Sequence, residues 1–186
     1  MTQLRTALVV VEMAALWAVP TLVLAASQVV LGQSSAVDLF RQVDKQERHL
    51  RSTQPDADTF EFVDAELPYF RGFKNGDLVG LAFFTNELDP KVQGYKASFW
   101  MLVGMTPSGR LTGVAIDYHA EPFGYFSIDS PAFDTQFEGK SVMDPLQVGD
   151  DIDAVSRATI TVESAARAIR QGSRQLMRQF LSEDRE

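Results

Sequence analysis

The chain has 186 residues, 45% of them hydrophobic and 23% charged, which is the composition of a globular protein with room for one domain. A formal net charge of −8 at pH 7 argues against binding to nucleic acid and against adsorption to anionic lipid through a charged surface. The chain has no cysteine, which excludes disulfides and cysteine-ligated clusters, and its only histidines, His49 and His119, make a multi-histidine metal site unexpected.

An apolar segment at residues 6–32 is predicted to be a transmembrane or signal helix. It is long enough to cross a bilayer, Arg5 precedes it, and the next charge after it is Asp38. By the positive-inside rule the N-terminus stays in the cytoplasm and the rest is exported, to the periplasmic side of an inner membrane. The small residues of LAASQ allow cleavage and release into the periplasm, whereas the length of the run favours an uncleaved anchor.

The exported part is predicted to begin with a short amphipathic helix. In residues 35–50, Val37, Phe40 and Val43 recur at helical spacing, and STQPDAD at 52–58 then interrupts the helix. The expected organisation is therefore an anchor or signal segment at 1–33, a helix and linker at 34–59, and a folded domain at 60–186.

Two β-hairpins are predicted next. LPYFRGF and LVGLAFFT flank a turn at Asn75 and Gly76, and Asn-Gly between apolar runs is a strong hairpin signal because both positions tolerate positive φ. ASFWMLVGM and LTGVAIDYH flank TPSGR, in which Pro107 and Gly109 suit turn positions. At least four strands of an antiparallel sheet are expected.

The C-terminal part is predicted to be an irregular stretch followed by a helix. Residues 119–150 are rich in Phe, Pro, Gly and Asp, and long irregular stretches often surround a site. Over residues 161–181 one helical face is apolar or small. The predicted fold class is thus α+β: an antiparallel β-sheet packed by a C-terminal amphipathic helix, preceded by one N-terminal transmembrane or signal helix.

The run DAVSRATIT at residues 153–161 has two interpretations. In the first it is an ordinary helix start, with Thr159 or Thr161 capping free backbone N–H groups and Asp153 supplying favourable charge. In the second the helix N-terminus and Arg157 stabilise a phosphate that is esterified to a threonine hydroxyl.

This run resembles the covalent flavin attachment motif of the FMN-binding domain family. That motif reads Asp, two variable residues, Ser or Thr, Gly, Ala and Thr, and here Asp153, Ser156, Ala158 and Thr159 match it. The departure is Arg157, where the family usually has Gly. The resemblance implies that FMN is carried on Thr159 through a phosphoester, and that a flavin transferase places it there from FAD.

The similarity covers roughly residues 60–175. GYKASFWMLVGMTPSGRLTGVAIDYHAEP resembles the family's strand, hairpin and His-x-Glu-Pro segment, and FEGKS at 137–141 resembles its Phe-x-Gly-Lys element. Members include subunits of the Rnf complex and of sodium-pumping NADH:quinone oxidoreductase, and the exported domain of the nitrous-oxide reductase regulator, whose branch is closest. The resemblance implies electron transfer with a membrane-bound redox partner.

Four further residues are candidates for the flavin site. His119 and Glu121 follow a predicted strand, and a loop at a strand end often carries a site, although a solvated loop is an equal alternative. Tyr95, after Gly94, is suited to pack on a flavin ring or to be a core aromatic. The carboxylates of Asp150, Asp151 and Asp153 are interpreted as a solvated acidic loop and not as a metal site.

The sequence contains no convincing nucleophile–base pair and no Gly-rich phosphate loop, so an enzyme with its own substrate is disfavoured. Two hypotheses follow. The favoured one is a membrane-tethered electron carrier whose organic redox group is supplied from outside the chain. The other is a non-redox sensory or regulatory module in which Arg157 marks a lost attachment site.

Overall fold

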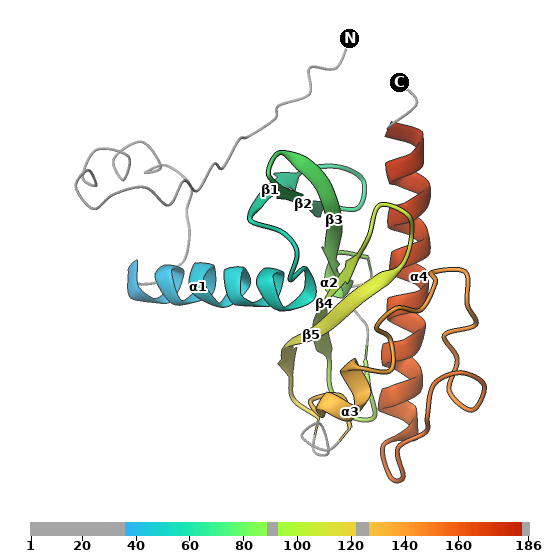
Figure 1. Ribbon diagram of the computed structural model, residues 1–186. Helices are drawn as coiled ribbons and strands as arrows, with labels where there is room; N and C mark the ends of the chain where they lie inside the picture. Colours follow the sequence, from blue (N-terminus) through green and yellow to red (C-terminus); the bar gives the residue numbers. More distant parts are fainter. Residues whose placement is uncertain (1–35, 89–92, 122–126, 184–186) are drawn as a thin grey trace.

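The computed structural model describes residues 36–88, 93–121 and 127–183 (Figure 1). Within these ranges no helix combines the length and the apolar character that a membrane span needs. The apolar segment 6–32, on which the anchor prediction rests, lies outside the described residues.

The centre of the fold is a five-stranded antiparallel sheet in which every strand pairs with its neighbour in sequence, in the order β1-β2-β3-β4-β5. The strands are β1 (Thr59–Val63), β2 (Tyr69–Lys74), β3 (Asp77–Phe84), β4 (Phe99–Met105) and β5 (Leu111–His119). The two predicted hairpins are β2–β3 and β4–β5. Their turns use positive φ as expected, with Asn75 at 53°, Gly76 at 91° and Gly109 at 81°. The sequence pattern did not single out β1, which adds the fifth strand.

Helices lie on both faces of the sheet (Figure 1). They are α1 (Ala36–Thr53), α2 (Thr85–Leu88), α3 (Pro131–Asp134) and α4 (Thr159–Glu183). The helices predicted near the N-terminus and at the C-terminus are thereby confirmed as α1 and α4, and the short helices α2 and α3 were not predicted. The α+β class, with an antiparallel sheet packed by the C-terminal helix, is confirmed.

The main core lies between the sheet and α4. Its fully buried members include Leu81, Phe83, Met101 and Val103 from the strands, and Ile169 from the helix. The apolar face predicted for the last helix is the face that meets them: its buried residues include Val162, Ala165, Ala166, Ile169, Ser173, Leu176 and Phe180. Burial of this stripe determines which face of α4 packs against the sheet.

The opposite face of the sheet receives the C-terminal end of α1. Leu50 packs there with Ala82 and Leu102. A Cβ atom at Gly104 would clash with the backbone carbonyl of Thr53, so glycine at this position allows the helix end to approach the strand closely. The helix thus contacts β4 and β5 directly.

Candidate functional site

The segment 153–161 leads into the start of α4, and Thr159 is the first helical residue. The first backbone bond of the helix runs from the Val162 N–H to the Ala158 carbonyl, at 3.0 Å. Ala158 has no side-chain oxygen, and no described residue accepts a hydrogen bond from the backbone N–H groups of residues 159–161. The start of α4 therefore presents three unpaired donors, which is the arrangement that favours an anion.

The prediction that Thr159 or Thr161 caps these N–H groups is wrong. The Thr159 hydroxyl is exposed and makes only a long 3.4 Å contact, as a donor, to the Val155 carbonyl. The Thr161 side chain is 2% exposed and is turned toward the interior. The structure therefore distinguishes two threonines that the sequence left equivalent, and only Thr159 has an accessible hydroxyl.

Thr161 is engaged with a buried carboxylate. Its hydroxyl donates to Glu121 Oε2 at 2.8 Å and accepts from the backbone N–H of Tyr95 at 3.1 Å. Glu121, 6% exposed, also accepts from the backbone N–H groups of Tyr95 at 3.0 Å, Lys96 at 2.9 Å and Ala97 at 2.6 Å. Burial alone raises the pKa of Glu121, but these N–H donors and the Thr161 hydroxyl outweigh it and hold the pKa below its usual value.

Gly94 completes this arrangement. A Cβ atom at this position would lie 2.7 Å from the Glu121 carboxyl carbon and 2.9 Å from the Thr161 methyl group, so a side chain has no room. Gly94, Tyr95, Glu121 and Thr161, called the Glu121 cluster below, were all candidates from the sequence, and the structure brings them together. The cluster links three parts of the chain: the turn before β4, the segment after β5, and the first turn of α4, to which Thr161 belongs.

Arg157 occupies the position at which the family usually has Gly. Its φ is 69°, in the left-handed region that strains residues with a Cβ atom. Its side chain is exposed and forms no hydrogen bond or ion pair with the described part of the chain. The glycine of the family is therefore explained by backbone conformation, and the guanidinium remains available to a ligand at the start of α4.

Arg157→Gly should raise the free energy of unfolding by about 1 kcal/mol, because glycine adopts positive φ without strain. Arg157→Ala retains the strain and removes only the guanidinium, so it should leave stability nearly unchanged. Urea unfolding of the parent and both variants measures this. Equal stability of Arg157→Gly and Arg157→Ala would show that the backbone at residue 157 is not strained.

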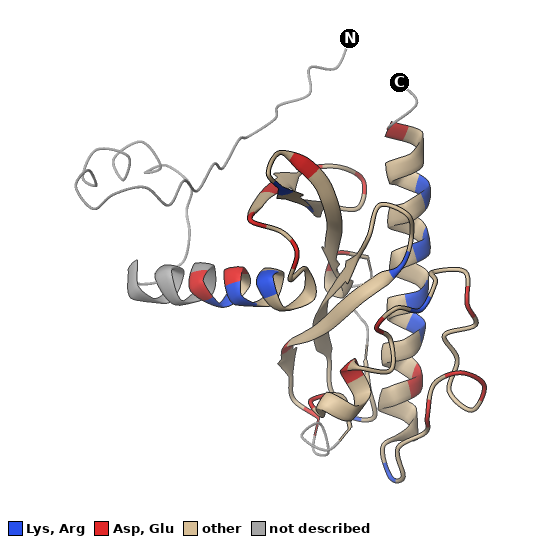
Figure 2. Cartoon of the chain, in the orientation of Figure 1, with Lys and Arg blue, Asp and Glu red and all other residues tan. Residues whose placement is uncertain are grey.

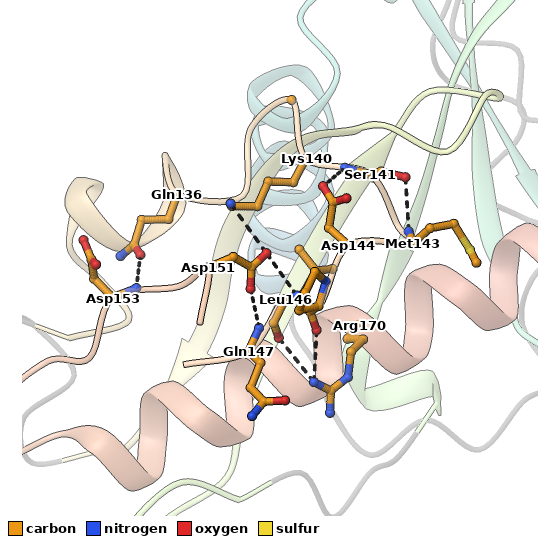
Figure 3. A network of polar contacts seen from close by, with 12 residues as sticks. Gln136, Lys140, Ser141, Met143, Asp144, Leu146, Gln147, Asp151, Asp153 and Arg170 are labelled. Atoms are coloured by element: carbon orange, nitrogen blue, oxygen red, sulfur yellow. Dashed lines mark hydrogen bonds and ion pairs between the residues drawn. The ribbon is translucent and has the colours of Figure 1, made fainter. Parts of the chain in front are cut away.

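The loop that precedes the motif is held by a polar network (Figure 3). Asp151 accepts from the backbone N–H groups of Leu146 at 3.1 Å and Gln147 at 2.8 Å, and it pairs with Lys140 at 3.6 Å. Burial alone would raise the pKa of Asp151, but the two N–H donors and Lys140 hold it below its usual value. Further along, the backbone N–H of Asp153 donates to Gln136 Oε1 at 2.6 Å.

Arginines of α4 fix the same loop from the other side. Arg170 donates to the Pro145 carbonyl at 3.1 Å, and Arg174 donates to the carbonyls of Val142 and Asp144, both at 2.8 Å. Figure 2 shows the resulting distribution, with basic residues gathered along α4 and acidic residues along the neighbouring loop. Across the described ranges, no group of three or more metal-ligating side chains could hold an ion. Of the three carboxylates interpreted as a solvated acidic loop, Asp150 and Asp153 are exposed, whereas Asp151 is half-buried in the polar network described above.

The FEGKS segment supports this network. Phe137 is fully buried, Gly139 has a φ of 75°, and Lys140 supplies the ion pair to Asp151. The Phe-x-Gly-Lys pattern thus anchors the loop that carries the chain to Asp153 and Ser156, whose side chains are exposed.

The remaining candidates lie at the ends of β4 and β5. His119 approaches Asp129, with 3.7 Å between Nε2 and Oδ2, and its buried Nδ1 has no hydrogen-bond partner among the described residues. Tyr95 is 56% exposed, which excludes the alternative that it is a core aromatic. The sequence analysis did not identify the contact between exposed Trp100 and Tyr118, whose ring centroids lie 4.9 Å apart. The two residues are cross-strand partners in the hairpin of β4 and β5, and the predicted hairpin was the signal that could have indicated this contact.

Comparison with known proteins gives one match. Residues 94–173 match the family model described as the FMN-binding domain, a range that runs from Gly94 of the Glu121 cluster through Thr159 to the middle of α4. No curated protein matches the chain. Residues 94–173 of this chain are therefore similar to the FMN-binding domain.

Proposed function

We propose that this protein is an exported, membrane-tethered flavoprotein that carries FMN covalently on Thr159 and passes electrons to a membrane-bound redox partner. The observation that carries the proposal is the difference between the two threonines within a matched FMN-binding domain: Thr159 is exposed at an uncapped helix start, whereas the Thr161 hydroxyl is buried and occupied.

The residues at the start of α4 fit a phosphoester. The N–H groups of residues 159–161 have no acceptor among the residues described, and the N-terminus of a 25-residue helix carries partial positive charge. Exposed Arg157 adds a guanidinium suited to phosphate oxygens. Together these donors would hold a phosphate on the Thr159 oxygen, and Tyr95 and His119 are candidates to lie along the flavin ring.

The proposed attachment balances as a phosphoryl transfer. The Thr159 hydroxyl oxygen attacks the FMN phosphorus of FAD, AMP leaves, and the hydroxyl proton is released. A flavin transferase catalyses the step, because the start of α4 holds no described base beside the hydroxyl. Bound FMN would supply one- and two-electron chemistry, and a covalent bond prevents its loss outside the cell.

Co-expression with a flavin transferase tests the proposal. The intact mass should rise by one FMN less one water, and the denatured protein should be yellow and fluoresce under ultraviolet light. A protein that never gains this mass and binds no FMN, although a known family member gains the mass in the same cells, would instead be the non-redox regulatory module. FMN that is released on denaturation would show that the protein is a flavoprotein that binds its cofactor without a covalent link.

Export is a separate prediction, motivated by the apolar segment 6–32 after Arg5. A reporter enzyme that is active only outside the cytoplasm, fused after Glu186, should be active. The matched control inserts two arginines after residue 32 and removes Arg5, which should lower the activity by reversing the charge bias. Activity of a cytoplasmic reporter alone in the parent fusion would contradict export.

A further inference from the structure

The edge of the sheet at β5 is open between two helices. Among the strands that the structure describes, β5 pairs only with β4, and its other side faces a cleft of about 390 Å³. Residues 113–116 form the floor of this cleft, His49 of α1 lies on one side, and Asp134 and Glu138 of the α3 region lie on the other. Figure 1 shows β5 at this edge, with α1 and α3 on either side.

The backbone at this edge is partly used by the chain itself. The Leu111 N–H donates to the Lys140 carbonyl at 2.9 Å, and the Leu111 carbonyl accepts from the Gly139 N–H at 2.8 Å. The segment around residues 139–141 therefore already pairs with the chain at the first residue of β5. The pairing stops there. Residues 113–116 make no backbone hydrogen bond to described residues other than those of the sheet, although alternate N–H and C=O groups of an edge strand point outward.

The side chains around the cleft make it negative. Asp134 Oδ1 is buried without a hydrogen-bond partner in the described ranges. Burial, and then the charges of Asp129 and Glu138, raise the pKa of Asp134 to about 7. Desolvation lowers the pKa of His49, which therefore adds no positive charge at pH 8.

The cations of α1 whose side chains the structure describes are engaged elsewhere, and Arg51 pairs with Glu47 at 2.8 Å. Lys45 pairs with Asp117 at 3.1 Å and Arg48 with Asp44 at 3.1 Å. The carboxylate of Asp134 thus lacks a cationic partner within the described parts of the protein.

We infer that the open edge of β5 is a docking site for an extended segment of a partner polypeptide, which adds a strand along residues 113–116 and places a lysine or arginine against Asp134. Strand addition supplies the backbone bonds, and the carboxylate supplies specificity. Residues 6–37 of this chain contain no lysine or arginine, so this stretch lacks the required cation. The inference does not depend on flavin attachment.

The test uses the full chain, labelled with ¹⁵N, at pH 8, where Asp134 is largely ionised. The probe is the peptide acetyl-Val-Thr-Lys-Val-Thr-amide, with two matched peptides: one with glutamate in place of lysine, and one N-methylated at alternate peptide groups. The lysine peptide should shift the amide signals of residues 113–116 and slow their hydrogen exchange at millimolar concentration. The N-methylated peptide, which lacks the donors, should not.

Asp134→Asn should weaken binding of the lysine peptide about tenfold, the effect expected from losing one charge-assisted hydrogen bond. Asp150→Asn, which changes an exposed carboxylate that does not line the cleft, should not weaken it. Glu138→Gln, at an exposed position, gives a second variant with a smaller loss if Asp134→Asn does not fold.

Three results would overturn the inference. The first is the absence of shifts at residues 113–116 with the lysine peptide. The second is equal binding of the three peptides, or of the parent and both acidic variants. The third is slow exchange, before peptide is added, of those amides among residues 113–116 that point away from β4, which would mean that another part of the chain, or a second copy if the protection depends on concentration, already covers the edge.

Discussion

Thr159→Ala should abolish the mass increase of one FMN less one water after co-expression with a flavin transferase. Thr159 is the exposed threonine at the start of α4, and the substitution removes the oxygen that would accept the FMN phosphoryl group. Alanine is a good helix former, so the helix start should be retained. The stability should change by less than about 1 kcal/mol, because the hydroxyl makes only one long contact in the structure. Thr159→Ser retains a hydroxyl and should retain part of the mass increase.

The matched control is Thr161→Val, which preserves size and removes the hydroxyl. It should still gain the flavin mass, but it should lose about 1–3 kcal/mol of stability because Glu121 and the Tyr95 N–H lose a buried partner. Intact mass and urea unfolding of the same samples give both readouts. If Thr159→Ala still gains the mass and Thr161→Val does not, the acceptor has been assigned to the wrong threonine.

Glu121→Gln should lower the free energy of unfolding at pH 7 by about 3 kcal/mol. The buried carboxylate accepts from three backbone N–H groups and one hydroxyl, and an amide would direct an NH₂ donor at some of these donors. Glu163→Gln, on the exposed face of α4, is the matched control and should change stability little. Equal stability of the two variants would contradict the role of the Glu121 cluster.

The pH dependence follows from the sign of the pKa shift. The pKa of Glu121 is lower in the folded state than its ordinary value of 4.5, so its stabilising contribution is complete above about pH 4.5 and is lost as the pH falls through the folded-state pKa. The difference in stability between the parent and Glu121→Gln should therefore shrink below pH 4.5. A difference that is constant from pH 7 to pH 3 would show that the carboxylate is not ionised in the native state.

Local sequence patterns were sufficient for much of the fold. The Asn75–Gly76 turn and the apolar stripe of α4 are determined within a few residues, so their periodicity and turn chemistry predicted them correctly. β1 was missed because its five residues carry no turn signal of their own, and it is recognised only through its pairing with β2. The similarity to the FMN-binding domain was recognised from the motif around Thr159 and from the segments that precede it.

The arrangement of the site depended on contacts that no local pattern contains. Glu121 and Thr161 are 40 residues apart in sequence, and nothing in either segment indicates that one hydroxyl is buried and the other exposed. The left-handed backbone at Arg157 was suggested only by the family's glycine. The sequence could therefore nominate the residues of the Glu121 cluster, whereas their hydrogen bonds required the packing of α4 on the sheet.

The meander order of the strands has a consequence for the timing of maturation. Each hairpin can form from adjacent residues as the chain emerges, which favours rapid formation of the sheet, whereas α4 is the last described element. The buried bond between Thr161 and Glu121 can form only when that helix docks, so the geometry around Thr159 is complete only at the end of folding. A truncated or misfolded chain would not present this geometry, and a modifying enzyme that recognises it would thereby select molecules that have finished folding.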